Sequence, residues 1–398
     1  MITVAQALEI IAGNARPGPA EPVPLGDALG RVLAADIRSD VDWPPFDTSA
    51  MDGYAVRVSD AARPGTLIPE RPGAVLAGDA LPEPLSPGEA VRVMTGAPLP
   101  AGAEAVVPVE HARREDGRVL FDAAPVPGAH LRRRGESVRA GSLLVPAGRR
   151  LTPGDVALAA LGGADPATVV ARPRVTVAAT GNELVSAGET PRPGQIRDSN
   201  GPMLLALCRA RGWPARQRPR IADDEAGLAS LFASAGVEED VLVTSGGVSA
   251  GDLDLLPEAA RREGFQILFH RVSIRPGKPI AFGRRNETLW FGLPGNPVSS
   301  SVCFHLFVRF ALDRLEGDPA PGAPRICARL ASGLPRGESR ETYRDGKLSN
   351  DAGVLRVEPL VSAGSHDLAA HARADALIRI PAGAQALPAG SEVECLLL

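Results

Sequence analysis

Aromatic side chains, cysteines and long apolar runs are all scarce in this sequence, and each scarcity excludes a class of structure. Aromatic residues make up 4% of the 398 residues, so Ala, Val and Leu must fill the cores. The cysteines lie far apart, and their spacings fit neither a zinc site nor a disulfide framework. They are Cys208, Cys303, Cys327 and Cys395. Cys208 and Cys303 fall inside apolar helical patterns, so we expect them to be buried thiols.

No segment has the composition of a membrane span or of a secretory leader. The longest apolar stretch, 302–312, is too short to cross a bilayer and carries His305 and Arg309. The first residues lack a basic region followed by an apolar core, and Glu9 comes early. We therefore expect a protein of the reducing cytoplasm that has no membrane partner.

The charge balance argues against a broad nucleic-acid-binding surface. Charged residues make up 23% and hydrophobic residues 44% of the chain, as in soluble globular proteins. The net charge is −4 and the pI is about 6.0, which argues against a basic surface over the whole protein but does not exclude a local basic pocket. The length predicts two to four domains.

Local patterns divide the chain into four passages. A capping box of Thr3 and Gln6 opens a predicted helix, and a second short helix is expected over 25–35. Short alternating runs between 47 and 140 predict a compact β domain. A helix around 153–161 would pack back against the N-terminal helices and make the first domain discontinuous.

The region 174–317 alternates strands with helices, which predicts a mainly parallel sheet covered on both faces. Ligands of such sheets bind outside the carboxyl ends of the strands. Three polar loops follow predicted strands here, so we expect them to share one edge. Short alternating runs beyond about residue 320 predict a small β domain.

The first of these loops has the chemistry of an anion site. The stretch 244–256 places glycines, Ser245 and Ser249 after an apolar strand, where backbone N–H groups and hydroxyls can converge on an oxyanion. Asp252 and Asp254 would hold a hard cation that neutralises the same anion.

Two further loops carry basic or helix-start groups. Arg271, Arg275 and Lys278 lie close together on a proline-stiffened segment, which suits phosphate or molybdate-type oxyanions. A third loop opens a long helix with Asn296 as its predicted cap and Pro297 at its first position. Its free N–H groups form an anion site, or the loop is simply a well-capped helix start.

Other polar segments leave a structural and a functional interpretation open. The loop 47–55 is either a polar turn or part of a site. Glu183 is a ligand-contacting carboxylate or a helix-start carboxylate. Asp198, Ser199 or Asn200 would cap the helix that follows, with capping as the expected role of Ser199, and Asp223 or Asp224 would cap a later helix that ends near Gly236. The basic stretch 132–134 is by default a solvated face, although it could reach an anionic ligand across a subunit interface.

Seven motifs occur in an order that resembles the MoeA family of molybdopterin molybdenumtransferases, whose animal relative is the gephyrin E-domain. The resemblance extends over nearly the whole chain, and the ordered set is far more specific than any single motif. The motifs are Ser49-Ala-Met-Asp-Gly-Tyr-Ala55, Met94-Thr-Gly-Ala97, Thr180-Gly-Asn-Glu-Leu184, Gly194-Gln-Ile-Arg-Asp-Ser-Asn200, Ser245-Gly-Gly-Val-Ser-Ala-Gly-Asp252, Pro276-Gly-Lys-Pro279 and Leu293-Pro-Gly-Asn-Pro-Val-Ser299.

The resemblance implies a multidomain α/β plus β fold. Its centre is a MogA-like doubly wound α/β domain, accompanied by a β-rich domain, a discontinuous helical N-terminal domain and a small C-terminal β-barrel-like domain. The implied boundaries are 1–39 with 140–172, 40–139, 173–317 and 318–398. The resemblance also implies an elongated homodimer whose active site lies between the two subunits.

The resemblance also implies the reaction and its partners. Molybdate is inserted at the dithiolene of adenylylated molybdopterin and AMP is released, with a divalent cation such as Mg²⁺. A molybdopterin adenylyltransferase would supply the substrate and molybdoenzymes would receive the product. An adenylyltransferase using MgATP, a tungstate-inserting variant and a non-enzymatic scaffold are the rival hypotheses.

Carried onto this chain, the resemblance implies three sets of site residues. The catalytic set is Asp52, Thr95, Glu183, Asp223, Asp254, Arg271, Arg275 and Lys278. The substrate-binding set is Ser245, Gly246, Gly247, Ser249, Gly251, Pro294, Asn296, Pro297 and Arg132. The metal ligands would be Glu183, Asp223 and Asp254.

Three departures from the family pattern stand out. The family often has Lys where this chain has Arg271 and Arg275, which keeps the charge but favours bidentate contacts. Ser137 stands after Glu136 where a carboxylate is usual. The stretch 362–366 resembles a family segment that often begins with Gln, and the role of its domain is left open.

Overall fold

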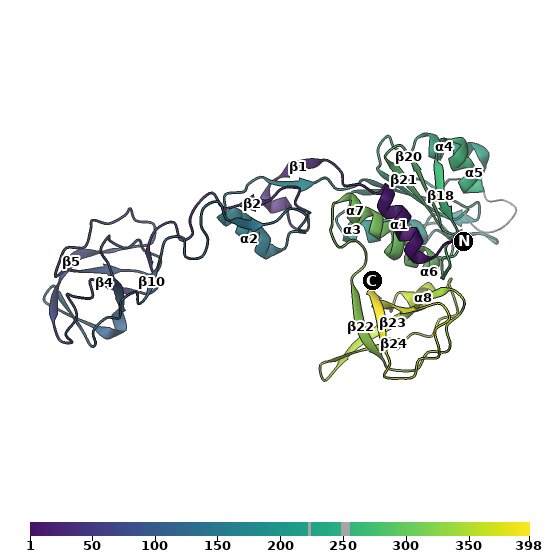
Figure 1. The fold of residues 1–398 in the computed structure, drawn as a ribbon. Coiled ribbons are helices and arrows are strands. Elements are labelled where there is room, and N and C mark those ends of the chain that lie inside the picture. The colour runs from purple at the N-terminus through teal and green to yellow at the C-terminus, as the bar shows by residue number, and fades with distance from the viewer. Residues whose placement is uncertain (222–223, 248–254) are drawn as a thin grey trace.

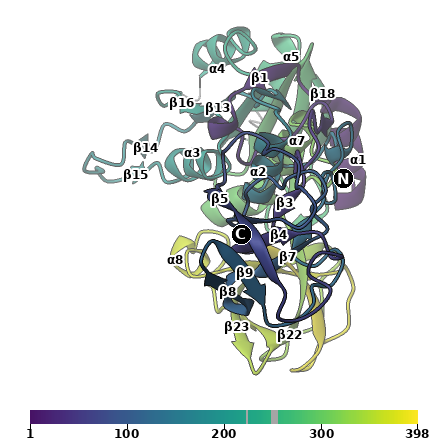
Figure 2. The same cartoon turned by 90° about the vertical axis from the view of Figure 1, so that its left-hand side faces the viewer.

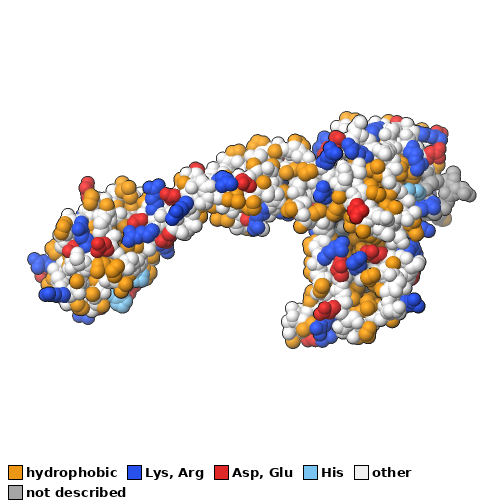
Figure 3. Space-filling model, viewed as in Figure 1, with side chains coloured by type: hydrophobic (Ala, Val, Ile, Leu, Met, Phe, Trp, Pro, Cys, Tyr) orange, Lys and Arg blue, Asp and Glu red, His pale blue; other side chains and the backbone are white. Residues whose placement is uncertain are grey.

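The protein is an elongated chain of structural units in the computed structural model, which describes residues 1–221, 224–247 and 255–398. A β-rich unit lies at one end, a small connecting unit follows, and a larger α/β body with a β-barrel beside it lies at the other end (Figure 1). Among the described helices, none combines the length and apolar character that a bilayer crossing requires. The face in Figure 3 carries basic and acidic side chains interspersed, in keeping with the small net charge.

The β-rich unit is built on a six-stranded sheet, as the short alternating runs predict. Its order is β7-β4-β6-β5-β9-β8, and apolar side chains from these strands form its cores. A separate pair, β3 with β10, leads toward the connecting unit. The elements are β3 (Thr48–Ser49), β4 (Gly53–Val56), β5 (Leu67–Val75), β6 (Ala90–Val93), β7 (Ala105–Pro108), the 3-10 turn η2 (Val109–His111), β8 (Ala112–Glu115), β9 (Arg118–Phe121) and β10 (Leu131–Arg132).

The connecting unit joins two segments that are far apart in the sequence. β1 (Ala20–Val23) pairs with β12 (Ala167–Val170), and β2 (Ile37–Arg38) pairs with β11 (Leu143–Val145). The helix α2 (Pro153–Leu161) forms as predicted, with a Thr152–Asp155 capping box.

The N-terminal segment differs from its prediction at residues 25–35 and in the packing of its first helix. The helix predicted over 25–35 is wrong, because only a 3-10 turn, η1 (Leu25–Asp27), forms before Gly30 turns the backbone at φ 73°. The helix α1 (Val4–Asn14) has the predicted capping box, but it packs against the α/β body rather than against α2.

The α/β body contains a six-stranded sheet covered on both faces. Its order is β16-β13-β17-β21-β20-β18, with the first four strands parallel and β20 antiparallel to both neighbours. The strands are β13 (Val175–Ala179), β16 (Ala215–Gln217), β17 (Val241–Ser245), β18 (Gln266–His270), β20 (Ala281–Arg285) and β21 (Thr288–Leu293). The sheet is mixed, because β20 and β21 form an antiparallel hairpin and β18 pairs antiparallel with β20.

Alternate residues of β17 explain why both faces are covered. Val241 and Val243 enter one core with α1, α3 and the last helix, whereas Leu242 enters a second core with α4 and α5. The helices are α3 (Asn200–Ala210), α4 (Glu225–Ala233), α5 (Leu255–Arg262), α6 (Pro297–Cys303), the π-helical turn η3 (Phe304–Val308) and α7 (Arg309–Leu315). The predicted long helix is thus continuous but contains a π-helical turn.

Three cap predictions can be compared with the structure. Asp224 caps α4, since its Oδ1 accepts from the Gly227 N–H at 2.7 Å. Ser199 makes no capping bond, so that prediction is wrong. The alternative cap Asp198 is confirmed, since its carboxylate accepts from the Gly201 N–H at 2.9 Å.

Two smaller features complete the fold. β14 (Leu184–Val185) and β15 (Ile196–Arg197) form an arm that extends from the α/β body (Figure 2). The C-terminal strands close into a barrel because β23 pairs with both β24 and β25, and α8 (Leu368–His371) lies beside it. These strands are β22 (Arg325–Leu330), β23 (Glu341–Asp351), β24 (Val354–Pro359), β25 (Ala376–Ile380) and β26 (Glu392–Leu397).

A buried ion network joins the connecting unit to the α/β body. Arg150 lies 2.8 Å from the Glu316 carboxylate and 3.1 Å from that of Asp313, and both acidic side chains are only 1% exposed. Arg172 and Arg211 approach the same two carboxylates at 3.5 and 3.2 Å. Two buried negative charges are therefore neutralised by arginines from separate segments.

We expect Arg150→Met to lower the free energy of unfolding by about 3 kcal/mol, because it leaves buried carboxylates without their principal cation. Urea denaturation followed by tryptophan fluorescence would measure the change. The control is Arg38→Met, which removes an exposed ion pair with Asp36 and should cost less than about 0.5 kcal/mol. Equal effects of both variants would contradict a structural role for the network.

Candidate functional site: an oxyanion cavity and a remote carboxylate

The polar loops of the α/β body meet at one edge of the sheet, as predicted. β13, β17 and β21 run parallel and end at Ala179, Ser245 and Leu293. β18 is antiparallel to β20, which is antiparallel to β21, so the segment 271–280 that follows β18 lies at this edge too. Such an edge is where doubly wound sheets bind ligands.

Close backbone approach explains the glycines after β17. Gly246 has φ 102°, and a Cβ there would lie 2.4 Å from the Thr180 carbonyl oxygen. Gly247 has φ 61°, the left-handed region that favours glycine. The predicted contact residues Ser249 and Gly251 lie outside the described residues.

Asn200 connects two of these loops, although sequence reasoning did not select it as a site residue. Its Nδ2 donates to Ser245 Oγ and to the Gly295 carbonyl, both at 2.7 Å. Its Oδ1 and the Thr180 hydroxyl are buried and have no hydrogen-bond partner in the described part of the chain. Within the described residues, two buried polar atoms therefore lie unpaired near this edge of the sheet.

The basic loop is held by its backbone. Arg271 has φ 73°, and its N–H donates to the Ile280 carbonyl at 2.9 Å, which closes the loop. The short strand β19 (Ile274–Arg275) pairs with Glu341–Thr342 of β23 and so fixes Arg275 to the barrel. Gly277 is also required, since a Cβ there would lie 2.5 Å from Cys303 Sγ.

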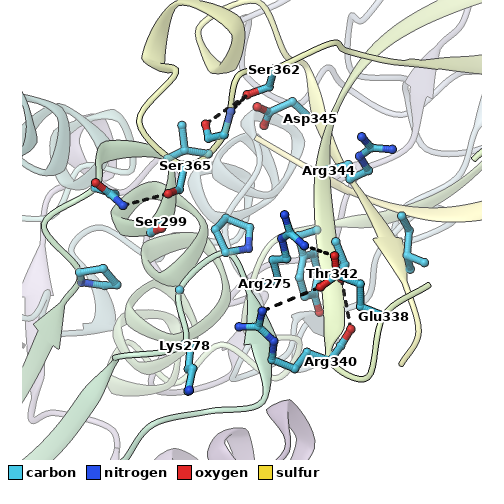
Figure 4. A pocket seen from close by; sticks show the side chains of 18 of the residues that line it. Arg275, Lys278, Ser299, Glu338, Arg340, Thr342, Arg344, Asp345, Ser362 and Ser365 are labelled. Carbon is cyan, nitrogen blue, oxygen red and sulfur yellow. Dashed lines mark hydrogen bonds and ion pairs between the residues drawn. The ribbon is translucent and has the colours of Figure 1, made fainter. Parts of the chain in front are cut away.

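A cavity of about 690 Å³ lies between this loop, the start of α6 and the barrel. Of the predicted residues, it gathers Arg275, Lys278, Pro294 and Asn296. The barrel side adds Arg336, Arg340, Arg344, Ser362, Ser365 and His366, and α6 adds Ser299. Figure 4 shows Arg275 and Arg340 beside Glu338, with Ser299, Ser362 and Ser365 on another part of the wall. Cationic and hydroxyl donors on rigid elements suit a tetrahedral oxyanion.

The start of α6 differs from its prediction. Asn296 occupies the cap position but its side chain makes no capping bond, and its Nδ2 donates to Ser365 Oγ at 2.9 Å. The Val298 N–H donates to the Ser365 carbonyl at 3.1 Å. The barrel therefore occupies part of the helix start, so the expected set of free N–H groups is incomplete.

Buried polar contacts hold α6 against the barrel. His371 Nδ1 is hydrogen-bonded to Asp345 Oδ1 at 2.7 Å, and His371 Nε2 is hydrogen-bonded to Ser301 Oγ at 2.8 Å. All three residues are buried. Asp345 also lines the cavity, so this chain of hydrogen bonds fixes one cavity carboxylate. The barrel residues were missed because nothing local marks them as facing the loop 275–279.

Lys278 carries a compositional signal that sequence reasoning overlooked. The chain has 43 basic residues, of which only Lys278 and Lys347 are lysines. Lys347 pairs with Asp375 at 2.8 Å, whereas the exposed Lys278 amine has no hydrogen bond or ion pair within the described residues. Lys278 therefore contributes a compact point charge to a cavity whose other cations are arginines.

The other predicted group lies at the far end of the molecule. Asp52 precedes β4 and Thr95 follows β6, and both Thr95 N–H and Oγ1 donate to Asp52 Oδ1 at 2.7 Å. The hydroxyl, followed by the N–H, lowers the pKa of Asp52 below its ordinary value. The β-rich unit is separated from the cavity by the connecting unit, so one chain does not bring these groups together (Figure 1).

The basic stretch beside this group is largely neutralised. Arg133 pairs with Asp47 at 2.7 Å and Arg134 with Asp42 at 2.6 Å. Arg132 instead lines a second cavity of about 430 Å³, together with Trp43, Ser137 and their neighbours.

The described residues do not define the expected metal site. Glu183 is exposed after β13, and its carboxylate folds back toward Gly181. The other expected ligands, Asp223 and Asp254, lie outside the described residues. Within residues 1–221, 224–247 and 255–398, no three carboxylate, His or Cys side chains cluster as a metal site would require.

Fold and cavity together define a modular protein that consists of an α/β body with the cavity at its ligand edge, a connecting unit, a β-rich unit and a C-terminal barrel. Three family models match it in order: the MoeA N-terminal region (domain I and II) over 2–163, a probable molybdopterin binding domain over 176–314, and the MoeA C-terminal region (domain IV) over 327–398. The chain belongs to the MoeA family of molybdopterin molybdenumtransferases.

Similar proteins agree over the full length. Molybdopterin molybdenumtransferase 2 of Mycobacterium tuberculosis is 36% identical, over 94% of this chain and 93% of that protein. The Bacillus subtilis molybdopterin molybdenumtransferase is 34% identical, over 100% and 94%. The crystal structure of a MoeA protein from Pyrococcus horikosii has a TM-score of 0.86 at 32% identity, covering 100% and 99% of the two chains. This likeness confirms the predicted fold class.

Thr95→Val should raise the pKa of Asp52 toward its ordinary value, because it removes the hydroxyl that stabilises the carboxylate. A lowered pKa keeps Asp52 ionised to lower pH, so the variant should lose that charge at a higher pH than the wild type. NMR titration of the carboxyl carbon measures this shift. Thr95→Ser keeps the hydroxyl and should retain the low pKa; a Thr95→Val titration identical to wild type would contradict the assignment.

Proposed function

We propose that the protein inserts molybdate into adenylylated molybdopterin, with release of AMP and formation of Mo-molybdopterin. The observation that carries the proposal is the oxyanion cavity, in which Arg275, Lys278 and Arg340 lie on rigid elements beside the ligand edge of the sheet. Family membership supports the same reaction, since the full-length relatives are named molybdopterin molybdenumtransferases.

The side chains would act mainly by positioning and charge neutralisation. Arg275 and Arg340 would hold molybdate oxygens through paired N–H donors, Lys278 would add a point charge, and Ser299 would donate a hydroxyl. Asn200, Ser245 and Thr180 would contact the pterin substrate at the edge of the sheet. Arg271 would add positive charge, while Pro294 and Pro297 would shape the helix-start loop.

A divalent cation such as Mg²⁺ would neutralise phosphate charge during AMP release. Glu183 is the described member of its expected ligand set, with Asp223 and Asp254 as the others. Tungstate has the same charge and shape as molybdate, so the same cavity would accept it.

We propose that the active site forms between two copies of the chain. Asp52 and Thr95 lie on the β-rich unit, remote from Arg275 and Lys278 of the same chain (Figure 1). A symmetric homodimer would bring the β-rich unit of one protomer to the α/β body of its partner. Arg132 would then face the ligand from the same side as Asp52.

The cellular setting follows from the same proposal. A molybdopterin adenylyltransferase would supply the substrate, and molybdoenzymes would take the product. We place this in the cytoplasm, because Cys208, Cys303 and Cys395 are buried as free thiols.

Molybdate-dependent AMP release, with formation of a Mo-bearing pterin, tests the reaction. Lys278→Met should lower the rate about ten- to a hundredfold, because it removes a charged donor to the oxyanion. Lys347→Met is the matched control, since that lysine pairs with Asp375 on the barrel outside the cavity, and it should keep full activity. AMP release that is independent of molybdate, or adenylylation of free molybdopterin from ATP, would contradict the proposal.

Mixing two inactive variants tests the shared site. Asp52→Asn and Lys278→Met alter opposite sides, so a mixed dimer would contain one intact site. Co-refolded variants should recover about a quarter of wild-type activity if the protomers mix at random. A mixture that stays as inactive as each variant alone, despite a mixed dimer confirmed by mass, would place the site within one chain.

A further inference from the structure

The cavity already contains a carboxylate that contacts its arginines. Arg275 donates through Nη1 to Glu338 Oε1, and Arg340 Nη2 lies 3.8 Å from Glu338 Oε2 (Figure 4). Arg275 comes from the loop of the α/β body and Arg340 from the start of β23. Glu338 therefore lies between two of the cations that would bind the oxyanion.

Backbone hydrogen bonds hold Glu338 in this position. Its carbonyl accepts from the Gly383 N–H at 2.6 Å, and the neighbouring Gly337 N–H donates to the Ala384 carbonyl at 2.8 Å. The segment that carries the carboxylate is thus attached to the loop between β25 and β26. The backbone that carries this carboxylate is therefore fixed within reach of both arginines.

The other cavity carboxylate does not compete for these arginines. Asp345 is buried and hydrogen-bonded to His371 at 2.7 Å. Among the described residues that line the cavity, Glu338 is therefore the one carboxylate that contacts Arg275 and Arg340.

The Glu338 contact is weak enough to be displaced. The side chains of Arg275 and Glu338 are 54% and 46% exposed, so solvent screens their attraction. A tetrahedral dianion offers both arginines two charges and more acceptor oxygens than one carboxylate. Displacement would leave Glu338 close to the bound dianion, where like charges repel.

We propose that Glu338 is an internal competitor of the oxyanion. Its carboxylate holds Arg275 and Arg340 while the cavity is empty, and molybdate must displace it in order to bind. Glu338 thereby lowers the affinity of the site for its oxyanion. The inference rests on the proposed function only for the identity of the oxyanion.

The test is calorimetric titration of the full-length wild type, Glu338→Gln and Glu338→Ala with molybdate, in parallel with sulfate and tungstate. Both variants remove the charge and should bind molybdate about two- to fivefold more tightly, the effect of abolishing an exposed competing ion pair. The matched control is Glu392→Gln, which removes a barrel carboxylate 3.8 Å from Arg329 and should leave the affinity unchanged.

Weaker or unchanged molybdate binding by both Glu338 variants, with wild-type melting temperatures, would overturn the proposal. Weaker binding would mean that Glu338 orients Arg275 for the ligand instead of competing with it. No binding to wild type or to either variant would also overturn it. Tighter molybdate binding by the Glu338 variants, without any molybdate-dependent AMP release by the wild type, would support the competition by Glu338 and refute the proposed reaction. The experiment therefore distinguishes a failure of this inference from a failure of the proposed function.

Discussion

The buried acidic pair Asp313 and Glu316 is the constraint on which the arrangement of the molecule depends. Two carboxylates without solvent contact require cations, and the structure supplies arginines from both sides of a junction between units. Arg150 comes from the connecting unit, whereas Arg211 comes from the body itself. Satisfying these charges holds the connecting unit against the body, and the β-rich unit that carries Asp52 extends from the connecting unit (Figure 1).

A second junction, between the body and the barrel, forms the cavity wall. β19 adds Ile274 and Arg275 to the edge of β23, and barrel residues such as Tyr343 enter the core of the body. The basic loop therefore connects β18 and β20 of the α/β sheet, and its own short strand β19 pairs with β23 of the barrel. The pairing fixes the backbone of Arg275, and the contact with Glu338 then positions its guanidinium.

Much of the local structure could be predicted because it depends on nearest neighbours. The capping boxes at Thr3 and Thr152 need only residues three positions apart. The apolar run 241–243 and the glycines after it predict a buried strand followed by a ligand loop. By contrast, the helix predicted over 25–35 does not form, because Gly26 and Gly30 favour turns.

The cavity shows what local reasoning cannot reach. Arg340 comes from a segment whose local pattern predicts only β structure, and the pairing of β19 with β23 brings it to the loop 275–279. Ser365 lies in the stretch 362–366, whose family resemblance gave it no role, and it meets the start of α6 through long-range packing. At the start of α6, the Ser365 carbonyl accepts from the Val298 N–H, whereas the predicted cap Asn296 makes no capping bond. Asn200 illustrates a third case: its motif was identified, but its bridging of two loops depends on the spacing between strands.

The rarity of lysine has a practical consequence for chemistry on this protein. Primary amines are confined to the N-terminus, Lys278 and Lys347, and the last of these is engaged by Asp375. An amine-selective reagent would therefore modify few positions, one of them at the mouth of the cavity. The protein thus carries a natural attachment point for a spectroscopic reporter beside its anion site, with no engineered cysteine.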